Sequence, residues 1–375
     1  MKKLLPIAAL ALLSSLAAAP AVLAQASAAQ AAGKTKPSPL APSEIVAAAS
    51  KSDWTRIAPS DLLVMDLSPD AKGRARRVVI QLMPPPFSQG WIGNIRKLAA
   101  AHWWDGMSIN RVQDNYVVQW GDPNADDKVK AKPLPAGLAT MAESEYTVAG
   151  MTISEAEATS IDFGTVNPRD GAAVFERMMS NAAEKSKEQD RIAHISIDGT
   201  QTTKTKDGWH ERDSFAEWVE IHRGWPLAAA GTGEQTRFWP IHCYGMVGVG
   251  RDLSPNTGSG AELYVVIGHA PRHLDRNIAL VGRVIEGIEY LSSLPRGHGG
   301  LGFYDLAQGD KRVRIRSIHP GPEVKDLPPY EYLSTESASF AKYADARANR
   351  RDAFFIRPAG GADICNIPVP VRRVK

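Results

Sequence analysis

Cysteine is scarce in this chain of 375 residues, which contains only Cys243 and Cys365. Two cysteines are too few for a disulfide-built scaffold, so the fold must depend on an apolar core. An oxidising compartment would permit a disulfide between them. Two buried thiols remain the alternative, because free cysteine packs as a small hydrophobic residue.

Long apolar segments are also lacking, with one exception at the N-terminus. There, Lys2 and Lys3 precede an apolar run over residues 4–23, and the small residues Val22 and Ala24 follow at the positions of a cleavage site. This layout is that of a secretory signal peptide. The sequence therefore predicts a signal peptide over 1–24 and export to a bacterial periplasm.

A membrane anchor is the alternative for this segment. Pro6, Ser14 and several alanines make the run marginal as a span. No cysteine comes directly after the run, which disfavours a lipoprotein anchor, and no later segment is long and apolar enough to cross a bilayer. We therefore expect no membrane span after cleavage of the signal.

An excess of one charge is missing as well. The formal net charge is +3, from 44 basic and 41 acidic residues. Cleavage would remove Lys2 and Lys3, leaving 42 against 41, or +1. A nearly neutral chain gives no electrostatic reason to expect nucleic acid as a partner.

Motifs for nucleotide, metal or nucleophilic chemistry are weak. His269 and His273 have the spacing of helical metal ligands, but Pro271 lies between them and favours a loop. Residues 248–250 lack a Walker lysine, and residues 258–260 lack the context of a nucleophilic serine. The sequence thus predicts no metal site and no cofactor.

Composition and periodicity divide the chain into five expected parts. These are a signal peptide (1–24), a disordered linker (25–43), an N-terminal extension (44–75), a main domain (76–322) with an insertion at about 123–240, and a tail (323–375) with one helix over 337–350. In the main domain, residues 76–82 predict a strand, and the apolar residues of 89–100 recur at helical spacing. Short strands outnumber helices, so we expect a β-barrel or sandwich with a few helices.

The insertion differs in character from its surroundings. We expect a polar helix over 172–191, a strand over 192–197 and an aromatic-containing loop over 200–225. The sequence indicates no catalytic residue there. It predicts only that the insertion and the tail are contact surfaces for other envelope proteins.

Five segments in order resemble the cyclophilin family of peptidyl-prolyl isomerases. They are RRVVIQL (76–82), the WDG turn (104–106), NRVQDNYVVQWGD (110–122), PNTGSGAELYVV (255–266), and LD followed by VGRVIEGI (274–288). The resemblance covers about 76–122 and 243–320. It implies an eight-stranded closed barrel capped by two helices, with a proline groove on its outside.

The resemblance also assigns roles. Arg111 matches the family's catalytic arginine, and Gln119 matches the side chain that holds the substrate carbonyl. The expected peptide-binding residues are Tyr116, Val117, Glu262, Tyr264, His273 and Leu274. The implied substrates are proline-containing polypeptides, and no cofactor is implied.

The chemistry suits an arginine. Isomerisation of an X-Pro bond must break amide resonance, a barrier of about 18–20 kcal/mol. A fixed donor aimed at the proline nitrogen binds the twisted form better than the planar form, which is catalysis by differential binding. Arginine stays charged and offers its donors in a rigid fork.

Several positions depart from the family pattern. Glu262 stands where glutamine is usual, His273 near the place of a tryptophan, Ile278 near that of a histidine or tyrosine, and Val117 in place of methionine. Two rivals to an isomerase follow. One is a non-catalytic proline-peptide-binding chaperone or envelope assembly factor, and the other is a structural protein that docks an envelope partner.

Overall fold

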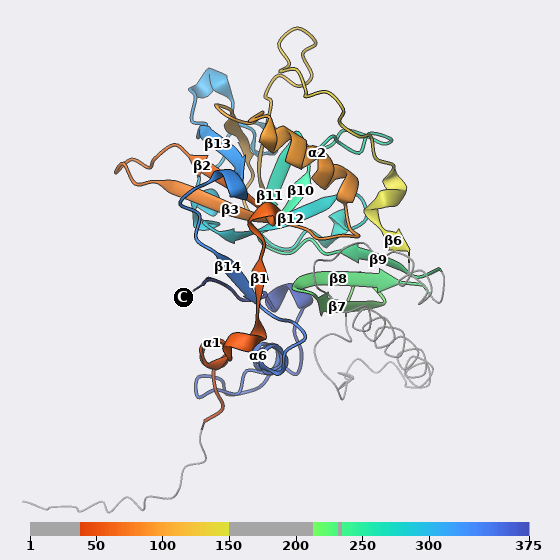
Figure 1. Cartoon of the computed structure of the whole chain (residues 1–375), viewed down its shortest axis with the longest axis vertical. Coiled ribbons are helices and arrows are strands. Elements are labelled where there is room, and N and C mark those ends of the chain that lie inside the picture. The colour runs from red at the N-terminus through yellow and green to blue at the C-terminus, as the bar shows by residue number, and fades with distance from the viewer. Residues whose placement is uncertain (1–37, 150–212, 232–234, 375) are drawn as a thin grey trace, which may run out of the picture. The chain divides into compact units, whose positions relative to one another are not determined.

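The computed structural model describes residues 38–149, 213–231 and 235–374 (Figure 1). The expected signal peptide, most of the expected linker, and the expected elements over 172–191 and 192–197 lie outside the described residues. Within the described ranges, no helix combines the length and the apolar character needed to cross a bilayer.

An antiparallel sheet of eight strands forms a nearly closed barrel, as predicted. In spatial order the strands are β13 (Ile315–Pro320), β2 (Leu62–Leu67), β3 (Arg76–Leu82), β12 (Leu280–Glu286), β10 (Met246–Val249), β11 (Leu263–Val266), β5 (Val117–Gly121) and β4 (Ser108–Val112). Backbone bonds then join the two end strands. The amide of Ile109 donates to the Val313 carbonyl at 2.9 Å, and that of Ile315 to the Met107 carbonyl at 2.8 Å.

The alternation along β3 explains how the barrel wall forms. Val78, Ile80 and Leu82 belong to the main core, whereas Val79 faces a separate apolar cluster with Leu62 and Tyr330. Successive side chains of a strand point to opposite faces. Both faces of β3 are therefore buried, one inside the barrel and the other against Leu62 and Tyr330.

Helix α2 (Gln89–Ala100) covers the barrel with its apolar face, and the fully buried Trp91 and Ile95 lie on that face. The indole of Trp91 donates to the Thr257 carbonyl at 3.0 Å. Ser88 occupies the expected N-cap position but has a φ of +57° and makes no side-chain cap. The second expected helix is short, the four-residue α5 (Glu289–Ser292).

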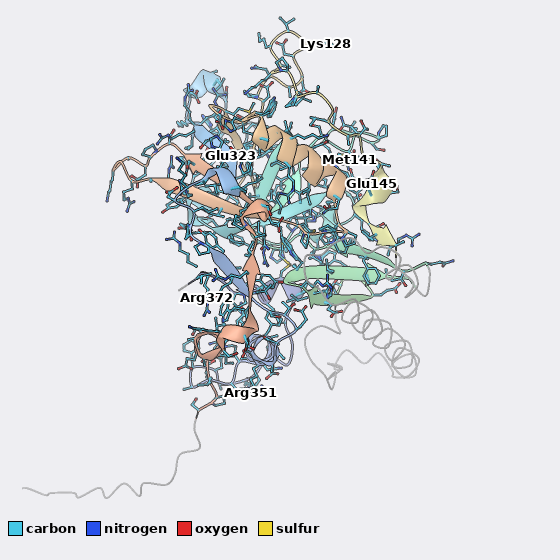
Figure 2. The ribbon with its side chains drawn as sticks, in the orientation of Figure 1. Lys128, Met141, Glu145, Glu323, Arg351 and Arg372 are labelled. Atoms are coloured by element: carbon cyan, nitrogen blue, oxygen red, sulfur yellow. A yellow bond between two sulfur atoms is a disulfide. The ribbon has the colours of Figure 1, made fainter. Side chains whose placement is uncertain are left out.

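The start of the expected insertion packs on α2. The Asn94 side chain donates to the Ala139 carbonyl at 2.8 Å and accepts from the Ala139 amide at 2.7 Å. A Cβ on Gly90 would lie 2.5 Å from the Met141 Cγ, so glycine allows this close approach. Figure 2 shows Met141 and Glu145 beside α2.

A second sheet belongs to the insertion. Its order is β6 (Val148–Ala149), β9 (Arg237–Pro240), β8 (Trp225–Ala230) and β7 (Trp218–His222). The expectation of a loop over 200–225 is wrong at β7. The short segment 218–222 reads as polar and aromatic, but all five residues pair with β8 across a tight turn at Gly224.

One buried arginine fastens this sheet to the barrel. Arg283 on β12 donates to the Gln81 Oε1 at 2.8 and 3.0 Å and to the Gly224 carbonyl at 2.5 Å. Its guanidinium also lies over the Trp225 ring, 4.6 Å from the centroid. Burial lowers the pKa of Arg283 to about 10.

The two ends of the described chain meet in a third sheet, β1 (Trp54–Ile57), β14 (Tyr330–Leu333) and β15 (Val371–Arg373). Helix α1 (Pro42–Ala48) contacts α6 (Ala338–Ala348), which lies within the range 337–350 expected for the tail helix. The segment expected as an N-terminal extension thus supplies a barrel strand, β2, as well as β1. Arg372 on β15 (Figure 2) places its Cζ 3.6 Å from the centroid of the Trp54 ring.

Cys243 and Cys365 form a disulfide with a Cα–Cα distance of 5.1 Å. The alternative of two buried thiols is therefore wrong. The bond joins the tail to a residue three positions before the start of β10. The two bonded cysteines are 122 positions apart in the sequence.

Candidate active site

Arg111 on β4 is held by three acceptors. Its Nε donates to the Leu301 carbonyl at 2.7 Å, and one terminal nitrogen donates to the Gln119 Oε1 at 2.9 Å. The other terminal nitrogen donates to the Gln113 Oε1. A guanidinium has five N–H groups. Among the described residues these bonds engage three of them, so the fork is fixed while two donors remain for a peptide.

Aromatic rings lie on either side of this guanidinium. Its Cζ is 5.5 Å from the centroid of Tyr116 and 5.4 Å from that of Phe303. Burial lowers the pKa of Arg111, but arginine remains charged in proteins. The site therefore presents a positive charge that is half-buried and immobilised.

An apolar cluster lies next to Arg111. Its buried members are Val117, Tyr264 and Val266, and the partly buried Tyr116, Leu274 and Ile278 pack against them. The structure thus brings together four predicted wall residues, Tyr116, Val117, Tyr264 and Leu274. The exposed His273 stacks on Tyr116 with a centroid distance of 6.4 Å. The individual roles of these residues remain predictions.

Gln119 is bound from both sides. Its Oε1 accepts from Arg111, and its Nε2 donates to the Glu262 Oε1. The register of β11 on β5 places Gln119 opposite Tyr264, two positions beyond Glu262. The Glu262 carboxyl therefore accepts a hydrogen bond from the Gln119 side-chain amide, the group that the family resemblance expects to hold the substrate carbonyl.

Glu262 should make peptide binding pH-dependent. Burial raises the pKa of its carboxyl above the ordinary value. As pH rises through that raised pKa, the carboxyl ionises and accepts more strongly from Gln119. We expect the KM for an X-Pro peptide to rise over this interval, upward from about pH 4.3, and Glu262→Gln to flatten the profile. Steady-state isomerisation kinetics across pH would measure this.

The control for that experiment is Glu289→Gln on the exposed face of α5. This variant should keep the native pH profile. A profile in Glu262→Gln that matches the native one would contradict the assignment. The free energy of unfolding also depends on this carboxyl. Because the pKa of Glu262 is higher in the folded state than in the unfolded state, stability falls as the pH rises from the unfolded-state pKa to the folded-state pKa.

A buried polar network supports Tyr264 from behind. The Tyr264 hydroxyl lies 2.8 Å from the His242 Nε2, and the His242 Nδ1 lies 2.8 Å from the Asp275 Oδ1. Burial holds the pKa of Tyr264 well above its ordinary value. The Asp275 carboxylate can only accept, so the His242 Nδ1–H donates to it. In a neutral imidazole Nε2 is then the acceptor, and the protonated Tyr264 hydroxyl donates to it.

The network continues to the insertion. Arg272 donates from Nε to the Asp275 Oδ2 at 2.7 Å and from its terminal nitrogens to both oxygens of Asp213 at 2.7 and 2.9 Å. The side chains of all three residues are at most 4% exposed. Asp213 lies in the insertion, so hydrogen bonds connect the insertion to Tyr264.

Sequence reasoning missed three contributors to this site. Gln113 and the Leu301 carbonyl hold Arg111, and His242 holds Tyr264. A backbone acceptor leaves no mark in a sequence. His242 carries no motif either, because its partner Asp275 is 33 positions away.

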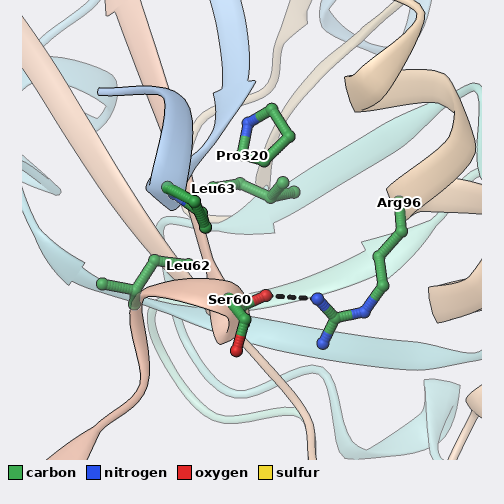
Figure 3. A pocket seen from close by; sticks show the side chains of 6 residues that line it. Ser60, Leu62, Leu63, Arg96 and Pro320 are labelled. Atoms are coloured by element: carbon green, nitrogen blue, oxygen red, sulfur yellow. Dashed lines mark hydrogen bonds between the residues drawn. The ribbon is translucent and has the colours of Figure 1, made fainter. Parts of the chain in front are cut away.

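One further hollow is separate from this site. It is lined by Ser60, Leu62, Leu63, Arg96, Pro320 and Pro322 (Figure 3). These residues include none of the predicted site residues. Arg96 crosses it to donate to the Ser60 carbonyl and, at 2.9 Å, to the Asp61 Oδ1.

A fixed arginine beside an apolar cluster suits the isomerisation of a peptide bond, which needs a placed donor and no nucleophile. The model of the family "Cyclophilin type peptidyl-prolyl cis-trans isomerase/CLD" matches residues 90–319. The chain belongs to this family and is a peptidyl-prolyl cis-trans isomerase. No curated protein matches it.

A solved structure shares the fold. The cyclophilin AquaCyp293 from Hirschia baltica aligns with a TM-score of 0.52 and 18% identity, covering 86% of this chain and 94% of that one. A cyclophilin-type isomerase from Cryptosporidium parvum aligns with a TM-score of 0.33 and 11% identity, covering 69% and 96%. At these identities the first likeness shows the fold alone.

Proposed function

We propose that this protein isomerises X-Pro bonds in exported polypeptides and thereby assists their folding in the periplasm. The observation that carries the proposal is the immobilised guanidinium of Arg111 beside the apolar cluster of Tyr116, Val117 and Tyr264. Export is supported by the signal-like segment 1–24, and the disulfide fits an oxidising compartment.

The chemistry follows from this geometry. The apolar cluster accepts the proline ring and holds it while the preceding residue rotates. In the twisted state the proline nitrogen gains a localised lone pair, and a donor of Arg111 binds that state better than the planar amide. No nucleophile is needed, because isomerisation breaks no covalent bond and only disrupts amide resonance.

The isomerase proposal is tested by cis–trans exchange of short X-Pro peptides, measured by NMR on the purified protein. We expect faster exchange in proportion to protein concentration, with a preference for apolar or aromatic residues near the proline. The absence of acceleration across peptides that differ in the residue before proline would contradict catalysis.

Export needs its own test. Fractionation of bacteria that express the full chain should recover the protein in the periplasmic fraction, with Gln25 as its first residue. A full-length protein retained in the cytoplasm would refute the exported role and leave the isomerase activity untouched.

A second candidate is a proline-peptide-binding chaperone with little catalysis. The contact of Glu262 with Gln119 favours it, because it occupies a donor that a substrate would use. Peptide binding without acceleration of exchange would select this candidate. Docking of envelope proteins on the insertion or the tail remains a prediction.

A further inference from the structure

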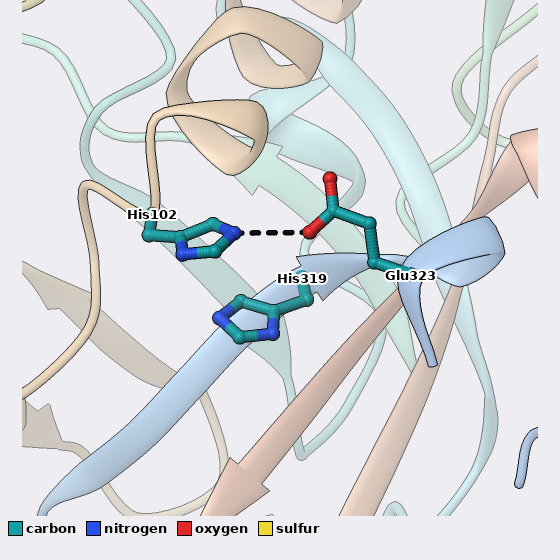
Figure 4. A group of neighbouring side chains, drawn as sticks. All are labelled: His102, His319 and Glu323. Atoms are coloured by element: carbon teal, nitrogen blue, oxygen red, sulfur yellow. Dashed lines mark hydrogen bonds and ion pairs between the residues drawn. The ribbon is translucent and has the colours of Figure 1, made fainter. Parts of the chain in front are cut away.

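Two histidines and two carboxylates gather at the end of α2, away from the proline site. His102 follows α2, His319 lies on β13, and Glu323 ends the short helix η9 (Gly321–Glu323) (Figure 4). The His102 Nε2 is 2.9 Å from the Glu323 Oε2, and the two imidazoles stack with a centroid distance of 4.0 Å. One ligand atom from each of the three residues lies within 4.8 Å of the others.

The backbone at His102 is unusual. The Trp103 amide donates to the Leu98 carbonyl at 3.0 Å and the His102 amide to the Ala99 carbonyl at 2.9 Å, which is the Schellman ending of a helix. In this ending the residue with positive φ is usually glycine. Here it is His102, with a φ of +51°. An imidazole therefore stands at a position where the backbone favours no side chain.

A fourth group orients the second histidine. The Asp105 Oδ2 is 2.8 Å from the His319 Nε2, and its Oδ1 accepts from the Ile318 amide at 3.0 Å. Metal-binding histidines usually have their second ring nitrogen bonded to a carboxylate or carbonyl in this way. The Asp105 contact leaves Nδ1 of His319 as the ligand nitrogen.

We propose that His102, His319 and Glu323 bind a divalent zinc-type ion, with water completing the coordination. Two imidazoles and one carboxylate are a donor set that Zn²⁺ accepts, at about 2.0–2.2 Å from each ligand atom. A tetrahedral site then separates its ligand atoms by about 3.3 Å. The His102–Glu323 contact of 2.9 Å needs to open by only a few tenths of an ångström. The ligand atoms of the three residues lie within 4.8 Å of one another, so the exposed His102 and Glu323 side chains must turn to bring all three to the ion.

The ion would join the C-terminus of α2 to β13 and η9, where the barrel closes. Its role would be structural, because no ligand belongs to the site around Arg111. The sequence predicts no metal site because His102 lies 221 positions from Glu323, and a pair such as His319 and Glu323 is not a motif by itself. The sequence pair with metal-like spacing, His269 and His273, is not in the ligand cluster of the described residues.

Calorimetric titration of the untagged protein with Zn²⁺ tests the proposal. We expect one equivalent to bind and the unfolding temperature to rise with Zn²⁺, since a ligand that binds the folded state stabilises it. His102→Gly and Glu323→Gln should each weaken binding by about 10-fold or more. Glycine suits the left-handed position, so the first variant should fold at least as well as the native protein.

His269→Ala is the matched control, since it removes an exposed histidine outside the cluster. It should bind Zn²⁺ as the native protein does. The proposal is overturned if the native protein binds no Zn²⁺, if His102→Gly binds it with native affinity, or if His269→Ala loses as much affinity as the cluster variants.

Discussion

Replacement of Arg111 by alanine is expected to lower kcat/KM for X-Pro exchange by about 10²–10³-fold, the usual loss when one fixed transition-state donor is removed. The donors of Arg111 act on the twisted bond, so the loss should appear in kcat more than in KM. Exchange spectroscopy on one peptide over a range of concentrations would separate the two constants.

Arg111→Lys refines this result. Lysine keeps the charge but lacks the planar fork that Leu301, Gln113 and Gln119 hold in place. We expect a rate between those of the native protein and the alanine variant. Arg74→Ala removes an exposed arginine paired with Asp70 and should leave the rate unchanged. An alanine variant of Arg111 that stays folded and keeps native kcat/KM would refute the assignment.

Substitution of Asp275 by asparagine is expected to lower the free energy of unfolding by about 3–5 kcal/mol, as for other broken buried charge pairs. Asp275 receives bonds from the backbone and ring of His242 and from Arg272. An amide cannot accept from all three groups or balance the buried guanidinium. Urea unfolding should show a lower midpoint with an unchanged slope.

The same variant should also affect the proline site. Without Asp275, His242 no longer has a fixed ring orientation, and the Tyr264 hydroxyl loses its defined acceptor. We expect a higher KM under conditions where the variant is still folded. Asp310→Asn is the control, because Asp310 pairs with Arg312 at the surface, where water screens the pair. Equal midpoints for the two variants would contradict the buried network.

Much of the fold was predictable because the barrel strands carry their pattern locally. The run from Arg76 to Leu82 is rich in β-branched residues, and α2 repeats its apolar residues at helical spacing. The strand β2 was assigned to an extension, since its burial comes from both the barrel and Tyr330 on a strand near the other end of the chain. The local sequence around β2 does not indicate a partner that lies so far along the chain.

The candidate site was predictable where it follows family motifs and not where it depends on this chain's own contacts. Arg111, Gln119 and the pocket residues lie in recognisable segments. The contact of Glu262 with Gln119 follows from the neighbouring positions of β11 and β5. The network from Asp213 to Tyr264 combines residues from the insertion and the barrel, and only three-dimensional proximity identifies it.

The disulfide has a consequence for how the protein is made. Chains are synthesised from the N-terminus, and domains tend to fold as they emerge. Cys243 and the neighbouring His242 are made well before Cys365, and β1 well before its partner β14. The Cys243 thiol therefore stays unpaired until Cys365, 122 positions later, has been made. A chain that stops before Cys365 would keep Cys243 as an unpaired thiol.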